Sequence, residues 1–402
     1  MKSQKWMEKY ILPENLTNKI FDNALRIFED NITKPQMKTL KTVVKWLWKN
    51  STTIISHIHR HTIETKKFIE KVSNHLWNMD IIKTVEKKAK ICINKTIKKN
   101  QETWERNIIA YDEWDIFKPD AKCMPWLSRV RDWSTGLTGN GYITRWVNVN
   151  WISLYSNLEK SDKDMTEKKR WEKTVLTIKK VQKDLWRQVG TYLIDRGWDD
   201  IIVIGYLADE GEKFIIRLKK NRNLLNIKNG KNTKIIDFKA WKHKVNIWWY
   251  ELILHVYKKP NKKDPIFLLT NDDEISTAET VNLYLKRWKV EEDFKKMKEL
   301  GLEDVRLLNL MKIQNLVALI QFIIILAQDV YNNVRKKVDI THEHIYLYFK
   351  NFCKRKSLTM NPTSFIKFIS FWLSNYEWYD TSLEPIDCLF WSKNDMKKMG
   401  II

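Results

Sequence analysis

The spacing of apolar residues divides the chain into three regions. Residues 1 to about 104 repeat apolar positions every three or four residues, the period of helices, and contain little strand pattern. From residue 107 to 270, short apolar runs of strand length alternate with helical stretches. Residues 336–402 return to a mostly helical pattern. This order predicts an α/β protein with a mixed sheet flanked by helices, preceded by a helical region.

Two of the apolar runs end in a carboxylate. Residues 107–112 end at Asp112, and because strand side chains alternate, Ile108, Ala110 and Asp112 share one face. Residues 191–195 end at Asp195 in the same manner. Further strands are expected at 127–130, 142–149, 213–219 and 265–270, with a β insertion at about 222–263. The Gly139-Asn140-Gly141 segment predicts a hairpin turn before residue 142.

A third carboxylate lies on a helix expected at 284–298, which contains neither proline nor glycine. At roughly 100° per residue, Tyr284, Arg287, Glu291 and Lys298 fall within an arc of about 60° beside an apolar stripe. Asp293 is expected on the solvent side. Carboxylates from three elements are the donor set that a pair of Mg²⁺ ions needs, and such a pair supports phosphoryl transfer.

Charge and cysteine usage narrow the partners and the compartment. Lys plus Arg number 72 against 49 Asp plus Glu, a formal net charge of +23, which favours a nucleic-acid partner. The basic N-terminal helices show no separate apolar face of the kind that binds membranes. Four scattered cysteines and the absence of an apolar leader predict a cytoplasmic protein. The apolar run Leu316–Ala327 predicts a buried core helix.

Glycine and tryptophan occur in unusual numbers. The chain has 10 glycines, far below the usual ~7%, and 20 tryptophans. Several tryptophans stand where a turn favours glycine, among them Trp133, Trp151 and the pair Trp248-Trp249. Two explanations stay open: a truly tryptophan-rich protein, or a gene in which UGA encodes glycine but is translated as tryptophan.

The spacing Tyr284-x2-Arg287-x3-Glu291-x6-Lys298 resembles the Y-R-E-K signature of one group of insertion-sequence DDE transposases. Asp112 is similar to the first aspartate of that family, and Asp195, followed by Arg-Gly, to the second. The resemblance covers roughly residues 105–330. It implies an RNase H-like catalytic domain at 105–335. No motif covers the two ends of the sequence, but the basic helical pattern of residues 1–104 predicts a helical DNA-binding domain, and residues 336–402 are expected to form a helical C-terminal region.

The resemblance also implies the roles of individual residues. Asp112, Asp195 and Glu291 would be catalytic and would bind two Mg²⁺ or Mn²⁺ ions. The DNA-binding residues would be Tyr284, Arg287, Lys298, Arg217 and Arg222, with Trp241, Trp248 or Trp249 stacking on a base. The partners would be terminal inverted repeats, target DNA and a second copy of the chain in a homodimer.

Some alternatives stay open at this stage. Asp115 competes with Asp112 for the first position, although it would lie on the opposite strand face. Asp199 and Asp200 compete with Asp195, although they are more typical of the start of a helix. At the level of function, a decayed or domesticated transposase that binds DNA without cleaving it, and a structure-specific nuclease, remain alternatives to an active transposase.

Overall fold

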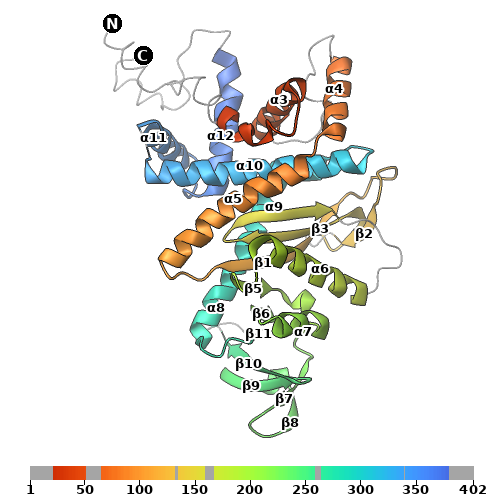
Figure 1. Cartoon of the computed structure of the whole chain (residues 1–402), viewed down its shortest axis with the longest axis vertical. Helices are drawn as coiled ribbons and strands as arrows, with labels where there is room; N and C mark the ends of the chain where they lie inside the picture. The colour runs from red at the N-terminus through yellow and green to blue at the C-terminus, as the bar shows by residue number, and fades with distance from the viewer. Residues whose placement is uncertain are drawn as a thin grey trace. The chain divides into compact units, whose positions relative to one another are not determined.

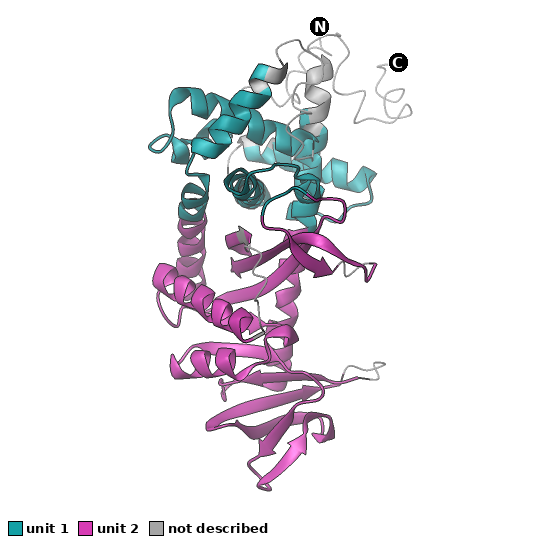
Figure 2. Ribbon diagram, turned by 90° about the vertical axis from the view of Figure 1, so that its right-hand side faces the viewer, with its two compact units in different colours: residues 1–88, 123–125, 295–402 teal, residues 89–122, 126–294 magenta. Residues whose placement is uncertain are grey.

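The computed structural model describes residues 21–50, 65–131, 135–158, 167–258, 264–338 and 340–379. The chain folds into two compact units (Figure 2). Unit 1 combines residues 1–88, 123–125 and 295–402, and unit 2 contains residues 89–122 and 126–294. The functional domains expected at 1–104, 105–335 and 336–402 stay predictions. The two units have other boundaries, since contacts group residues 1–88 with residues 295–402.

Unit 1 is helical. Its elements are η1 (Arg26–Phe28), α3 (Lys34–Asn50), α4 (Thr65–Asn78), η6 (Leu302–Asp304), α10 (Leu310–Lys336), α11 (Ile340–Arg355) and α12 (Pro362–Tyr379), and the first part of α5 (Ile81–Glu102). Buried polar contacts join N-terminal to C-terminal helices: Trp48 Nε1 donates to the carbonyl of Ile366 at 3.3 Å. Asn315 Nδ2 similarly donates to the carbonyls of Leu76 and Met79. Helices from the N-terminal and C-terminal parts of the described chain therefore share one core.

Helix α10 is the centre of that core (Figure 1). It is long and apolar enough, by length and composition, to cross a membrane, but 78% of its most apolar window is buried inside the structure. Residues on all sides of the helix are buried between Leu316 and Ala327. The prediction of a buried core helix here is confirmed.

Unit 2 is built on an 11-stranded mixed sheet. The strand order is β2-β3-β1-β5-β6-β11-β10-β9-β7-β8, with β4 paired to β3. Only β1–β5 and β5–β6 among the described pairs are parallel. The strands are β1 (Ile108–Phe117), β2 (Ser128–Arg131), β3 (Thr138–Val149), β4 (Ile152–Leu158), β5 (Thr191–Ile194), β6 (Lys213–Arg217), β7 (Asn223–Asn226), β8 (Lys231–Lys234), β9 (Trp241–Ile247), β10 (Tyr250–Tyr257) and β11 (Ile266–Thr270).

Helices cover both faces of the central strands. The helical elements of unit 2 are α6 (Glu167–Leu185), η3 (Arg196–Trp198), α7 (Ile201–Asp209), η4 (Ile235–Asp237), α8 (Thr277–Leu285), η5 (Lys286–Trp288) and the start of α9 (Lys289–Glu299). Ile108 of β1 packs with Leu283 and Tyr284 of α8. Tyr111, on the opposite face of β1, contacts Thr174 of α6 at 3.2 Å. The predicted α/β class, with its β insertion and helical N-terminal region, is confirmed.

Three local predictions were wrong. Gly139-Asn140-Gly141 is not a turn but part of β3, paired with β2. A Cβ atom at Gly141 would lie 2.2 Å from the carbonyl oxygen of Ile116, so glycine serves close strand approach there. Strand β1 does not end at Asp112 but continues to Phe117. The helix expected at 284–298 is interrupted by the 3₁₀ turn η5.

Candidate active site

Asp112 and Asp195 lie side by side because of the parallel pairing of β1 and β5. The last paired residues of these strands are Tyr111 and Ile194, so each aspartate is the next residue of its strand. Ile108 packs against α8, and Asp112 has the same strand parity. Both carboxylates therefore emerge at one edge of the parallel pair, on the face that α8 covers.

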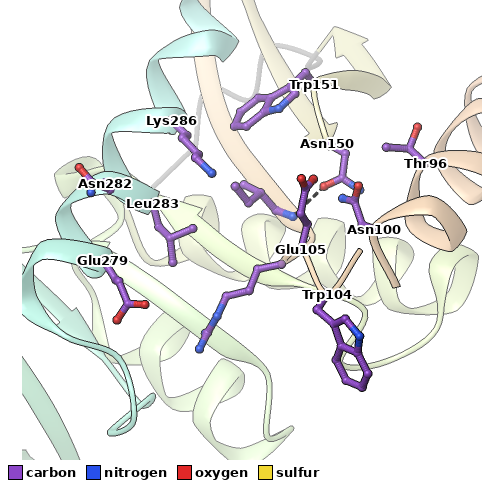
Figure 3. A pocket seen from close by; sticks show the side chains of 12 residues that line it. Thr96, Asn100, Trp104, Glu105, Asn150, Trp151, Glu279, Asn282, Leu283 and Lys286 are labelled. Carbon is purple, nitrogen blue, oxygen red and sulfur yellow. Dashed lines mark hydrogen bonds between the residues drawn. The ribbon is translucent and has the colours of Figure 1, made fainter. Parts of the chain in front are cut away.

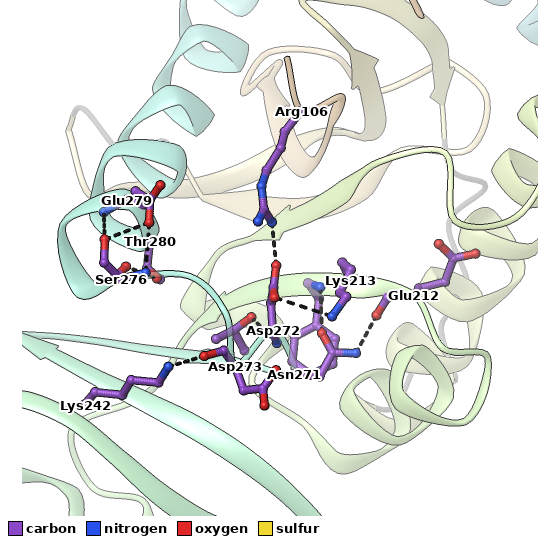
Figure 4. A network of polar contacts seen from close by, with 12 residues as sticks. Arg106, Glu212, Lys213, Lys242, Asn271, Asp272, Asp273, Ser276, Glu279 and Thr280 are labelled. Carbon is purple, nitrogen blue, oxygen red and sulfur yellow. Dashed lines mark hydrogen bonds and ion pairs between the residues drawn. The ribbon is translucent and has the colours of Figure 1, made fainter. Parts of the chain in front are cut away.

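The segment between β11 and α8 fixes the helix that faces these aspartates (Figure 4). Buried Asp272 pairs with Arg106 and, at 3.4 Å, with Lys213. Ser276 and Glu279 form a reciprocal capping box at the start of α8. The cap satisfies backbone donors that a helix start leaves unpaired. These contacts anchor the helical segment from which Tyr284, Arg287 and Glu291 project.

One guanidinium contacts all three predicted acids. Arg287 Nη1 lies 2.6 Å from Asp112 Oδ2, and Nη2 lies 3.2 Å from Glu291 Oε1 and 3.9 Å from Asp195 Oδ1. The hydroxyl of Tyr284 donates to Asp195 Oδ1 at 2.8 Å. Arg287 is buried, whereas the Glu291 side chain is 46% exposed. Elements far apart in sequence thus bring three carboxylates, a cation and a phenol together.

The cluster contains more negative than positive charge. Burial raises the pKa of Asp112 to about 7; Arg287 opposes this shift, and the charges of Asp195 and Glu291 add to it. Burial and the neighbouring Asp195 carboxylate also raise the pKa of Tyr284, so its hydroxyl stays a neutral donor. One guanidinium cannot balance three carboxylates, and the site favours additional positive charge.

The donor chemistry suits hard divalent cations. Carboxylate oxygens are the ligands that Mg²⁺ prefers. Within the described residues, no group of three or more His, Cys, Asp or Glu side chains is already arranged to hold a metal ion. The three carboxylates are instead gathered around Arg287. The residues present therefore fit a metal centre in kind and in charge, with the guanidinium bridging the acids.

Comparison with known proteins supports this interpretation. Residues 153–326 match a family model described as the transposase DDE domain. The chain carries a transposase DDE domain. The match includes Asp195 and Glu291, whereas Asp112 precedes it. The predicted resemblance to DDE transposases is confirmed, but membership of the Y-R-E-K group stays a prediction.

Two further comparisons concern the chain as a whole. The cryo-EM structure of a piggyBac transposase synaptic complex with hairpin DNA is 10% identical, with a TM-score of 0.44. The similarity covers 89% of this chain and 75% of that chain. A search of curated proteins finds no match.

The rival aspartates of the transposase have other partners. Asp115 accepts a hydrogen bond from the backbone N–H of Arg131 at 3.3 Å. Asp200 caps α7 by accepting from Ile202 N at 2.9 Å, as expected for a helix start. Asp199 is not a surface helix charge, because it is buried and pairs with Arg222 at 2.5 Å. None of these described contacts involves the Arg287 cluster.

The predicted DNA-binding cations lie in different settings. Tyr284 and Arg287 belong to the carboxylate cluster, and Arg222 is occupied by Asp199. Lys298 pairs with Glu303 at 2.6 Å within unit 1. Arg217 lines a cavity of about 380 Å³ in unit 2. The other cations lining that cavity are Arg196, Lys219 and Lys220.

Two buried contacts beside the cluster were missed from the sequence. Asp293 is 2% exposed, so its predicted place on the solvent side was wrong, and its carboxylate accepts from Asn148 of β3. Glu113, which follows Asp112, pairs with Arg145 at 3.0 Å and Arg170 at 2.5 Å. Asp293 lies about 100° around the helix from buried Phe294, so the buried surface of α9 extends beyond its single apolar stripe.

Proposed function

We propose that this transposase cleaves the ends of its own element and joins them to target DNA by phosphoryl transfer assisted by Mg²⁺ or Mn²⁺. The observation that carries the proposal is the convergence of Asp112, Asp195 and Glu291 on Arg287. Three carboxylates from β1, the end of β5 and α9 are held within reach of one another by one guanidinium. Surface acids that merely end strands would have no reason to share a buried cation.

The chain's own residues prepare this site. Asp112, Asp195 and Glu291 would hold two metal ions, which when bound activate the attacking oxygen and stabilise the leaving one. Tyr284 orients the Asp195 carboxylate through its hydrogen bond. Arg287 offsets part of the repulsion among the acids and keeps the Asp112 carboxylate in place. Phosphoryl transfer depends mainly on positioning and charge neutralisation, and these contacts supply the positioning.

The cation-lined cavity next to Asp195 provides a path for DNA. Arg196 and Arg217 line it together with Lys219 and Lys220, and Arg196 directly follows Asp195 in the chain. Phosphate contacts by Lys and Arg dominate the affinity of proteins for DNA. The backbone of a terminal repeat could therefore lie along this cavity with a phosphodiester at the acids. Joining two ends to one target favours a homodimer as the active form.

The test is a cleavage and strand-transfer assay on DNA that carries the terminal repeats, with Mg²⁺. Glu291→Gln should lower the rate by about 10²–10³-fold while DNA binding persists, because a charged donor is lost from the site. Glu292→Gln is the matched control, since Glu292 is the exposed neighbour on the same helix. Equal rates for the two variants would contradict the proposed role of the acids.

A second candidate function is a domesticated or decayed transposase that binds DNA without cleaving it. Tryptophan at positions with positive φ is the observation in its favour, because it strains tight turns. Binding of terminal-repeat DNA without nicking, by the protein in its natural sequence, would support this candidate over the enzyme.

A further inference from the structure

Tryptophan dominates the backbone positions that favour glycine. In the part of the chain that the structure describes, ten residues other than glycine have positive φ, and six of them are tryptophan. They are Trp104, Trp126, Trp151, Trp186, Trp241 and Trp248. Tryptophan accounts for only 20 of 402 residues. A bulky side chain at positive φ is a genuine outlier, so six such cases share a cause.

Trp104 closes helix α5 in a position that glycine usually occupies. Its φ is 56°, and its N–H bonds to the carbonyl of Gln101. The next N–H, of Glu105, bonds to the carbonyl of Asn100 at 2.9 Å. These two bonds form a Schellman motif, whose left-handed residue is most often glycine. The side chain of Trp104 is 95% exposed at the margin of a cavity of about 630 Å³ (Figure 3), so packing does not explain it.

Two hairpins show the same substitution in two turn types. Asn150 and Trp151, with φ of 48° and 71°, join β3 to β4 across the pair Val149–Ile152. Positive φ at both central residues defines a type I′ turn, which favours Asn-Gly. Trp248, with φ of 58°, begins the two-residue connection between β9 and β10. Positive φ at the first central residue is typical of a type II′ turn, which has glycine there.

The three remaining positions repeat the pattern. Trp126 follows Pro125 and has φ of 58°, as glycine does after proline in a type II turn. Trp186 directly follows the last residue of α6 with φ of 68°. Trp241 has φ of 121°, in a region that side chains rarely adopt. Trp133 lies outside the described residues.

Other tryptophans behave as ordinary core residues. Trp48, Trp146 and Trp198 are at most 3% exposed, and none of them has positive φ. Trp198 packs edge-on against the ring of Tyr111 and lies under the guanidinium of Arg170. Among the described residues, positive φ therefore sets six tryptophans apart from these buried ones.

We infer that glycine stands at positions 104, 126, 151, 186, 241 and 248 in the protein made by its own cells, because the codon at these positions is read there as glycine. The core tryptophans are genuine. The reassignment removes Trp241 and Trp248 from the residues that could stack on a DNA base and leaves Trp249, which is 71% exposed. It also removes the strained turns that favour a decayed protein.

A single tryptic peptide tests the inference. Residues 146–160 follow Arg145 and end at Lys160, and they contain both core Trp146 and turn residue Trp151. Mass spectrometry of this peptide from cells that carry the gene should find tryptophan at 146 and glycine at 151. The gene should correspondingly have UGG at 146 and UGA at 151.

Each other outcome overturns the inference. Tryptophan at both positions would show that the strained turns are real. Glycine at both would show that backbone conformation does not separate the two classes. Because the readout is sequence and not activity, the inference stands or falls independently of the proposed DNA cleavage.

Discussion

Replacing the six turn tryptophans together by glycine should raise the free energy of unfolding. A left-handed conformation costs an L-residue about 1–2 kcal/mol. The greater freedom of glycine in the unfolded chain returns about 0.4–1 kcal/mol of that. The net gain is then about 0.5–1 kcal/mol per position and ~3–6 kcal/mol for six separate positions, a large part of the ~5–15 kcal/mol that stabilises an ordinary protein.

Burial makes this sum uneven. Four of the side chains are 66–95% exposed and lose almost no packing: Trp104, Trp186, Trp241 and Trp248. Trp151 is partly buried, and Lys289 lies 4.6 Å from its ring centre, so its gain should be smaller. The single Trp104→Gly variant should therefore show the effect most cleanly.

Urea unfolding followed by circular dichroism measures the difference without relying on tryptophan fluorescence. Both the Trp104→Gly variant and the variant with all six substitutions should unfold at a higher urea concentration than the tryptophan-containing chain, with an unchanged m-value. The matched control is Trp198→Gly, which should lose about 3–5 kcal/mol because a buried ring is removed. If the variant with all six Trp→Gly substitutions is no more stable than the tryptophan-containing chain, the strain argument is refuted.

Three further predictions concern the site and the sheet. Arg287→Gln leaves three acids without their shared cation and should destabilise the metal-free protein by about 3–5 kcal/mol; thermal melts should show partial recovery with Mg²⁺, and identical melts with and without Mg²⁺ would contradict this. Because the folded pKa of Asp112, about 7, exceeds its unfolded value, its contribution to stability is complete below pH ~4 and is lost as pH rises to ~7. In the Asp112→Asn variant, the free energy of unfolding should fall by up to ~4 kcal/mol less over this pH range than in the unsubstituted protein. Parallel plots of unfolding free energy against pH for the two proteins would argue against this role of Asp112. Gly141→Ala should cost about 1–3 kcal/mol through backbone overlap, whereas Gly197→Ala, which meets nothing within 4 Å, should change the urea midpoint little; a tolerated Gly141→Ala would count against the close approach.

Much of the site could be predicted because it depends on local periodicity. Strand alternation placed Asp112 on the same face as Ile108, and that face is the one α8 covers. The helical arc that joined Tyr284, Arg287 and Glu291 survives the 3₁₀ turn between them, since three residues of tighter winding rotate the side chains only slightly. Periodicity of this kind is carried by neighbouring residues, and a single sequence contains it.

The errors arose where a distant segment decides the environment. Gly141 looks like a turn residue until Ile116 of β1 is placed against it. Asp293 looks solvent-facing until Asn148 of β3 supplies a buried partner. Strand β1 runs beyond Asp112 because its pairing with β3 continues to Phe117, although its pairing with β5 ends at Tyr111. These contacts join residues 24 to 145 positions apart, and no local pattern specifies them.

The β insertion leaves and re-enters the sheet at one place. Arg217, near the end of β6, is paired with Leu268 of β11, so residues 218–265 begin and end on neighbouring strands. Because the two ends of the insertion lie on paired strands, the insertion can be lengthened, shortened or exchanged without moving the strands that carry the acids. The insertion can therefore vary in length and sequence while the geometry of the Arg287 cluster stays constant.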